Sequence, residues 1–264
     1  HPEAIALAFV HAETSTGVCS DVRSLSALAH RYNCLSIVDA VTSLGGVELR
    51  VDEWEIDAIY SGTQKCLSCV PGISPVSFSP RAVEVIRNRR HKVQSWFLDL
   101  NLVMDYWGSG ARRSYHHTAP VNALYALHES LVLLQKETLE AAWHRHAYHH
   151  QALAAGLQAM GLNLIVDARY RLPQLNAVSV PDGVDEAVVR QKLLSDWNLE
   201  IGAGLGSLAG KVWRVGLMGY AARQTNVLLF LSAMESTLLT MNVPLTAGAA
   251  VSAAKRVYDA RTVR

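Results

Sequence analysis

The stretch CLSIVDAVTSLGG at residues 34–46 gives the clearest indication of the fold. It starts as a short, mostly apolar run and then reaches Asp39. Similar apolar runs occur at Ala4–Val10 and Ile56–Tyr60, and the segment Val22–Tyr32 has helical spacing. Short apolar runs are typical of buried strands in a parallel-rich sheet, and their alternation with helices predicts an α/β fold. Ligands of such sheets bind beyond the carboxyl ends of the strands.

Composition excludes several classes of protein. The chain has 264 residues, is 50% hydrophobic and only 18% charged, and carries a net charge of +1. An average soluble domain is about 25% charged, so apolar material for a core is ample and disorder is excluded. The near-zero charge predicts no nucleic-acid partner and no anionic membrane partner. The first residue is His1 rather than methionine, so we expect this sequence to be part of a longer chain.

Two domains are predicted. Residues 1–145 form a large domain with a mainly parallel sheet, and residues 146–264 form a small α+β domain. The stretch Ala119–Arg145 is predicted as one long helix with leucines at core spacing. Residues 227–254 contain a single charge, but polar residues and a proline interrupt them, so two buried helices are favoured over a membrane span.

Three further patterns each allow two interpretations. Cys66 and Cys69 form a C-x-x-C pattern, for which reduced cytosolic thiols are favoured over a redox pair or half a zinc site. His146 and His150 lie four apart on a helix, and an exposed histidine-rich turn is favoured over a metal site, so no metal is predicted. The basic helix Ser79–Arg90 is interpreted as a solvated face rather than a nucleic-acid patch.

Three residues suggest one chemistry. Lys65 follows a predicted buried strand, a setting that favours a desolvated, nucleophilic amine. Asp39 ends another strand, where a carboxylate pairs with a protonated ring nitrogen such as that of pyridoxal phosphate (PLP). Arg214 is able to bind a carboxylate with two donors. From spacing alone, structural roles for all three residues remain an alternative to PLP chemistry.

Five ordered blocks resemble a known family. They are HAETSTG at residues 11–17, IVDAVTSLGG at 37–46, YSGTQK at 60–65, YHHTAP at 115–120 and KVWRVG at 211–216. Together they resemble the class V aminotransferases of PLP fold type I, especially the alanine–glyoxylate, serine–glyoxylate and serine–pyruvate group. The resemblance implies a transaminase that moves an amino group from alanine or serine to glyoxylate or pyruvate.

The resemblance also implies the roles of residues around the cofactor. Lys65 would form the internal aldimine with PLP and move the proton during transamination. Asp39 would pair with the pyridinium nitrogen, and Val41 would pack on one face of the ring. Thr14 would lie near the polar edge of the ring, and Gln64 would contact the phosphate.

Other implied roles involve the substrate and a second subunit. Arg214 would hold the carboxylate of the amino acid and of the 2-oxo acid. Tyr115 and Thr118 would reach the phosphate of a neighbouring subunit, so a homodimer with a shared active site is expected. In this family an upstream loop and an aromatic residue complete the cofactor site, and the chain is expected to lack both.

Alternatives stay open at this point. They are another class V activity, such as 2-aminoethylphosphonate or kynurenine-type transamination or a lyase reaction, and a non-catalytic protein that only dimerises. A cytoplasmic location is expected, while peroxisomal and mitochondrial locations stay open because of the expected missing beginning.

Overall fold

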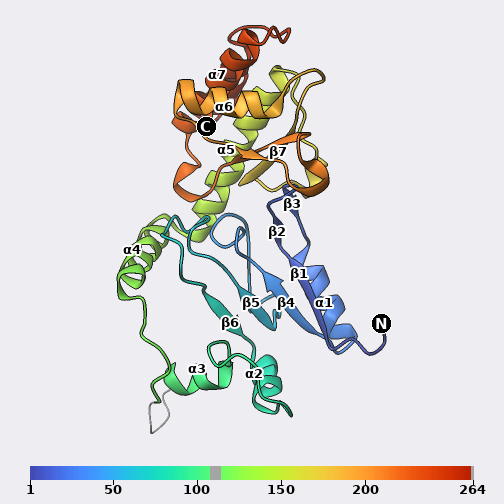
Figure 1. Ribbon diagram of the computed structural model, residues 1–264, viewed down its shortest axis with the longest axis vertical. Helices are drawn as coiled ribbons and strands as arrows, with labels where there is room; N and C mark the ends of the chain where they lie inside the picture. The colour runs from blue at the N-terminus through green and yellow to red at the C-terminus, as the bar shows by residue number, and fades with distance from the viewer. Residues whose placement is uncertain (108–113, 263–264) are drawn as a thin grey trace.

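Four strands form the sheet of the N-terminal unit, in the order β1-β4-β5-β6. The first three strands are parallel and β6 is antiparallel to β5. Their bounds are β1 Ala6–Val10, β4 Leu35–Asp39, β5 Ala58–Tyr60 and β6 Val76–Phe78. The prediction of a mainly parallel α/β sheet is therefore confirmed. The computed structural model describes residues 1–107 and 114–262 and is elongated, with the two units stacked along its long axis (Figure 1).

Helices flank this sheet. Helix α1, Val22–Arg31, packs against β4 and begins at Asp21, whose side chain accepts a hydrogen bond from the Ser24 amide at 3.0 Å. Helices α2, Pro80–Arg87, and α3, Leu100–Trp107, lie at the far end of the unit, away from the C-terminal unit (Figure 1). The basic stretch at residues 79–90 thus includes a real helix, with Pro80 at its first turn.

The predicted long helix is two helices. Helix α4, Val121–Glu137, ends at Thr138, and α5, Leu139–Ala159, begins there. Thr138 has φ 74° and ψ 151°, which breaks the helix, and its hydroxyl accepts from the Ala141 amide at 3.3 Å to start the next one. The expected core face of α4 is also wrong, because no residue of α4 is buried.

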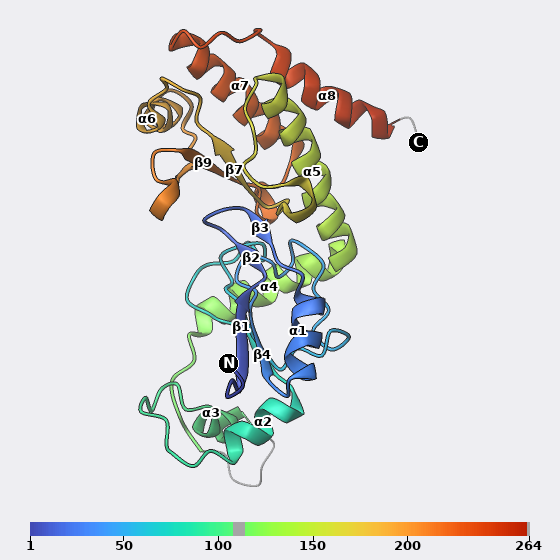
Figure 2. The same cartoon turned by 90° about the vertical axis from the view of Figure 1, so that its right-hand side faces the viewer.

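The C-terminal unit has an antiparallel sheet in the order β7-β9-β8. Helix α5 and two helices from this half of the chain lie against it, and the last helix of the chain packs on α5 (Figure 2). The bounds are β7 Leu175–Ser179, β8 Gly202–Ala203, β9 Val212–Gly216, α6 Glu186–Trp197, α7 Gln224–Thr240 and α8 Ala249–Thr262. Trp213, Leu153 and Met234 are fully buried between sheet and helices, so this core is where most apolar area leaves water.

The region rich in apolar residues at 227–254 belongs to α7, the turn after it and the start of α8, as predicted. Glu235 of α7 accepts hydrogen bonds from the Gly248 amide at 2.5 Å and the Ala250 amide at 2.9 Å, so a buried carboxylate caps α8. Across residues 1–107 and 114–262, no helix combines the length and the hydropathy that crossing a bilayer requires.

A short hairpin joins the two units. Its strands are β2, Ala12–Glu13, and β3, Val18–Cys19, and they pair with each other. Gly17, at the turn, has φ 83° and accepts from the Leu172 amide at 2.9 Å, so the hairpin docks on the C-terminal unit. The predicted boundary between residues 145 and 146 lies inside α5, and its position stays a prediction.

Candidate active site

Asp39 stands at the carboxyl end of β4 with both carboxylate oxygens oriented. Its Oδ1 accepts from the Val41 amide at 2.8 Å, and its Oδ2 accepts from the Tyr60 hydroxyl at 2.8 Å. The bond to Asp39 raises the pKa of Tyr60, since it favours the protonated phenol. The carboxylate is therefore held in one orientation at the sheet edge.

The acceptor capacity of Asp39 fits the ring nitrogen of PLP. A carboxylate offers about four lone-pair sites. The Val41 amide and the Tyr60 hydroxyl occupy one site on each oxygen. A further N–H donor, such as a protonated pyridine nitrogen, is thus accommodated without breaking either bond.

Lys65 lies in the loop that follows β5, which we name the lysine loop and define as residues 61–69. The loop is fixed at its start, where the Ser61 hydroxyl donates to Ala40 O at 2.8 Å. The buried Thr63 hydroxyl donates to Val70 O at 2.6 Å and closes the loop on itself. Lys65 is half-buried, and its carbonyl accepts from the Ser68 amide at 3.0 Å. A half-buried lysine on a fixed loop is held in place to act as a nucleophile or a base.

Both units hold the lysine loop. From α4, the Ser130 hydroxyl donates to Leu67 O. From the C-terminal unit, the Tyr220 amide donates to the Ser68 hydroxyl at 2.8 Å. Gly219 packs so closely that a Cβ there would lie 2.7 Å from Cys66 O, which only glycine avoids.

Val41 and Gln64 are brought together beside Gly62. A Cβ built on Gly62 would lie 2.7 Å from Gln64 Oε1 and 3.3 Å from Val41 Cγ1. The Gln64 side chain is exposed, so its amide is available to a ligand. The structure therefore gathers three of the expected cofactor contacts, Asp39, Val41 and Gln64, around the start of the lysine loop.

Arg214 reaches from β9 to the hairpin. Its Nε donates to Ala203 O at 2.6 Å and its Nη1 donates to Thr14 O at 3.1 Å. Among the described residues, Nη2 has no hydrogen-bond partner, although it lies near the backbone of Gly202. Part of the guanidinium's donor set thus fixes it in place, and the rest remains for a carboxylate.

The hairpin starts next to Asp39. The amide of His11, which follows β1, donates to Asp39 O at 2.9 Å, so Thr14 and the aspartate belong to the same sheet edge. This is the carboxyl edge, and it faces the C-terminal unit (Figure 1). Asp39, Lys65, Thr14 and Arg214 thus lie at the junction of the two units.

Tyr115 and Thr118 lie elsewhere. The Tyr115 hydroxyl and Thr118 Oγ1 are 2.7 Å apart, and the Tyr115 ring meets the edge of Tyr106 on α3. Tyr115 is 69% exposed. The chain therefore pairs these two residues with each other and not with the lysine loop, and their contact with a neighbouring subunit's phosphate stays a prediction.

The favoured interpretation of the histidine-rich segment was wrong. His146 is fully buried. Both ring nitrogens have partners there, because the Gly219 amide donates to Nε2 at 2.9 Å and Nδ1 donates to Ala142 O at 2.6 Å. Burial lowers the pKa of His146 to about 4. In the part of the chain that the structure describes, no cluster of three metal-ligating side chains occurs.

The four cysteines carry free thiols. Cys66 is buried in the lysine loop and its Sγ donates to Thr42 O at 3.3 Å. Burial raises the pKa of the Cys66 thiol to about 12, so it stays protonated at neutral pH and is not a nucleophile.

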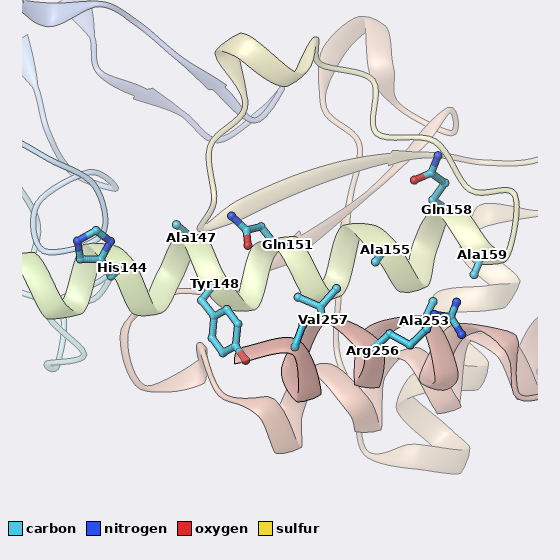
Figure 3. Close-up of a pocket in the computed structure, with 11 residues that line it drawn as sticks. His144, Ala147, Tyr148, Gln151, Ala155, Gln158, Ala159, Ala253, Arg256 and Val257 are labelled. Carbon is cyan, nitrogen blue, oxygen red and sulfur yellow. The ribbon is translucent and has the colours of Figure 1, made fainter. Parts of the chain in front are cut away.

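A separate concavity lies on the surface of the C-terminal unit. It is a surface groove of about 960 Å³ between α5 and α8, with Tyr148 and Gln151 on one wall and Arg256 on the other (Figure 3). Ala147, Ala155 and Ala253 also line it, and the small side chains explain why the groove is open. It contains none of the predicted site residues.

Sequence reasoning missed Tyr60. The residue was treated as the end of a strand, while the structure places its hydroxyl on the predicted catalytic carboxylate. The available signal is that Asp39 and Tyr60 both end apolar runs, because equivalent ends of neighbouring parallel strands lie side by side.

Comparisons with known proteins agree with the resemblance carried by the five sequence blocks. A family model described as aminotransferase class-V matches residues 1–227. The (S)-ureidoglycine–glyoxylate transaminase of Bacillus subtilis is 40% identical over 271 residues, covering 96% of this chain and 65% of that protein. The alanine–glyoxylate aminotransferase of Callithrix jacchus is 42% identical over 236 residues, covering 89% of this chain and 57% of that protein. The chain thus spans 57–65% of the length of these curated relatives.

Solved structures show the same relationship. The Bacillus subtilis ureidoglycine–glyoxylate aminotransferase superposes with a TM-score of 0.93 at 43% identity, covering 97% of this chain and 65% of that one. The pyridoxamine–pyruvate aminotransferase of Mesorhizobium loti superposes with a TM-score of 0.91 at 29% identity, covering 99% of this chain and 66% of that one. Fold type I and the cofactor PLP follow from these matches, as the sequence blocks predicted, and the donors and acceptors at Asp39 and Lys65 fit that cofactor. The chain belongs to the class V aminotransferases.

Proposed function

We propose that the protein transfers an amino group from alanine or serine to glyoxylate or pyruvate. The observation that carries the proposal is the junction of the two units, where Arg214 reaches Thr14 at the same sheet edge that presents Asp39 and the lysine loop. An amine, a carboxylate and a guanidinium at this junction are the groups that transamination requires.

Each of these residues has a distinct task. When bound, PLP supplies an electron sink for the pair left on the substrate α-carbon. Asp39 would accept a hydrogen bond from the ring nitrogen and so hold the ring at the end of β4. Val41 would limit the ring's tilt from one face, and Gln64 would donate its amide N–H to the phosphate.

Lys65 would bind the cofactor and then move a proton. Its amine would take the proton from the substrate α-carbon and return it to the adjacent cofactor carbon, so one base serves both positions. The lysine loop is pinned at Ser61, Leu67 and Ser68, which keeps the amine within reach of both positions. General-base catalysis contributes about 10²–10⁴-fold, and removal of the amine should cost at least that.

Arg214 would orient the substrate. Alanine, serine, glyoxylate and pyruvate all carry a carboxylate next to the reacting carbon, so one guanidinium serves both half-reactions. Because the hairpin is bound to the same side chain, the position of the substrate carboxylate is tied to that of Thr14.

We also propose a homodimer with a shared site. Helix α4 exposes apolar side chains that a monomer does not use, including Leu124 at 43% and Leu131 at 46% exposure. Tyr115, just before α4, is exposed as well. A second copy packed on this face would place the paired Tyr115 and Thr118 hydroxyls near its partner's cofactor phosphate.

A second donor is favoured by one comparison. The relative whose match covers 96% of this chain is named for (S)-ureidoglycine and glyoxylate. The mammalian relative is named for alanine and glyoxylate, so the two names differ in the amino donor and agree in the acceptor. We therefore propose glyoxylate as the preferred acceptor and include (S)-ureidoglycine beside alanine and serine as donors to be tested.

A donor screen tests the proposal. The purified protein is loaded with PLP and incubated with glyoxylate or pyruvate and each donor, with 2-aminoethylphosphonate and kynurenine added as competing candidates. We expect turnover with an α-amino acid donor, and loss of turnover and of the visible cofactor band in Lys65→Ala. The matched control is Lys255→Ala, because Lys255 is exposed on α8. A PLP-free, inactive protein that still dimerises would instead support the non-catalytic alternative.

A further inference from the structure

The Tyr60 hydroxyl binds the Asp39 carboxylate, but Tyr60 has no task in the proposed chemistry. Asp39 and Tyr60 are register partners on parallel strands β4 and β5, so their side chains leave the same face of the sheet side by side. The Tyr60 hydroxyl donates to Asp39 Oδ2 at 2.8 Å, while the ring remains 41% exposed. The side chain of Tyr60 therefore binds the carboxylate at the sheet edge and is not part of the buried core.

The backbone around this pair is rigid. The Ala40 amide donates to Tyr60 O at 2.8 Å, and the Ser61 hydroxyl donates back to Ala40 O at 2.8 Å. Hydrogen bonds therefore join β4 and β5 at the residues that follow Asp39 and Tyr60. Rotation of the Asp39 carboxylate about χ2 would break its hydrogen bond to the phenol, so Tyr60 opposes that rotation.

Rotation of Asp39 matters because its two oxygens are not equivalent. Oδ1 is bound by the Val41 amide, which belongs to the residue expected to lie against the cofactor ring. Without the phenol, only the Val41 amide would bind the carboxylate, and Oδ2 would have no bond that fixes its position. With it, both oxygens keep one free lone-pair site at a defined position.

We propose that Tyr60 is a positioning residue that holds the Asp39 carboxylate in the orientation that meets the ring nitrogen of PLP. The inference rests on the proposed function, because it assigns Asp39 the ring nitrogen as its ligand. Tyr60 itself touches neither substrate nor cofactor in this assignment.

The direct test measures PLP affinity. Apo-protein is titrated with PLP, and the dissociation constant is taken from the visible band that disappears in Lys65→Ala. Tyr60→Phe keeps the ring and removes the hydroxyl, and a hydrogen bond to a charged group is typically worth about tenfold or more in an equilibrium constant. We expect about tenfold weaker PLP binding and a lower kcat with little change in KM. Tyr32→Phe, at a 70% exposed tyrosine of the same unit, should equal the wild type.

A double-mutant cycle separates positioning from packing. If the hydroxyl acts through Asp39, Tyr60→Phe should weaken PLP binding much less, about threefold at most, when Asp39→Asn is already present. An equal loss in both backgrounds would overturn the inference, since the hydroxyl would then act independently of the carboxylate.

A cofactor-free measurement checks the contact itself. The ultraviolet titration of Tyr60, obtained as wild type minus Tyr60→Phe, should show a pKa above that of an ordinary tyrosine, and Asp39→Asn should bring it down. No change in Asp39→Asn would overturn the pairing.

The outcomes also separate the two proposals. Wild-type protein that shows no Lys65-dependent PLP binding overturns the proposed function and this inference with it. Wild-type protein that binds PLP, together with a Tyr60→Phe variant that equals Tyr32→Phe, overturns this inference alone.

Discussion

Acid should weaken the fold through His146. The imidazole is fully buried, with Nδ1 donating to Ala142 O at 2.6 Å and Nε2 accepting from the Gly219 amide at 2.9 Å. The neutral ring satisfies both bonds. A protonated ring would place an N–H on Nε2 opposite the Gly219 N–H and would bring a charge next to Arg145. Acid therefore acts on the contact that attaches α5 to the turn beside the lysine loop.

The size of the effect follows from proton linkage. Burial lowers the pKa of His146 to about 4, against about 6.5 for an unfolded histidine. Between these values the unfolded chain binds more protons, so stability falls as the pH falls. From pH 7 to pH 5, this one residue should lower the free energy of unfolding by about 2 kcal/mol.

Urea unfolding at pH 7, 6 and 5 measures this slope. His146→Gln removes the titration, so the change in its unfolding free energy between pH 7 and 5 should be about 2 kcal/mol smaller than in the wild type. His128→Gln, at an exposed histidine on α4, should keep the wild-type slope. Equal slopes in all three proteins would refute a buried, neutral His146.

Three further substitutions have defined outcomes. Arg214→Lys keeps the charge but loses the forked donors, so KM for the amino donor should rise about tenfold while PLP affinity stays constant, as steady-state kinetics and PLP titration will show. Asp57→Asn should lower the free energy of urea unfolding by about 3 kcal/mol, because this carboxylate is 2% exposed and is paired with Arg81 at 3.0 Å. Glu235→Gln should cost about 1 kcal/mol in thermal unfolding, since it weakens the cap of α8.

Matched controls sharpen these measurements. Arg23→Lys on the exposed face of α1 and Asp182→Asn in an exposed turn should leave both kinetics and stability unchanged. An Arg214→Lys protein with a normal KM would show that another group binds the substrate carboxylate. An Asp57→Asn protein as stable as Asp182→Asn would mean that the Asp57–Arg81 pair contributes little. A Glu235→Gln protein with unchanged thermal stability would show that α8 starts without that cap.

The sheet edge was predictable because its signals are local. Asp39 and Lys65 follow short apolar runs, and strand ends of this kind are set by the residues next to them. The ordered family blocks then assigned the residues their expected roles. The same local signals also give the position of Tyr60, but not its bond to Asp39, which depends on the register between two strands.

Other features depend on partners that are distant in sequence. His146 sits among further histidines and looks like a surface residue, yet Gly219, 73 positions away, supplies its partner. The break at Thr138 was missed because neither glycine nor proline marks it, and threonine seldom adopts a positive φ. Leu124 and Leu131 have core spacing, but spacing does not say whether the covering surface belongs to the same chain.

The contacts that both units make with the lysine loop have an evolutionary consequence. Ser130 holds Leu67 from one side, and Gly219 and Tyr220 press on Cys66 and Ser68 from the other. A bulkier residue at position 219 fits only if the lysine loop moves away, and that movement would also displace the Lys65 amine. Residues 66–68 and 219–220 are therefore under joint selection, and substitutions in one group should be tolerated or rejected according to the other.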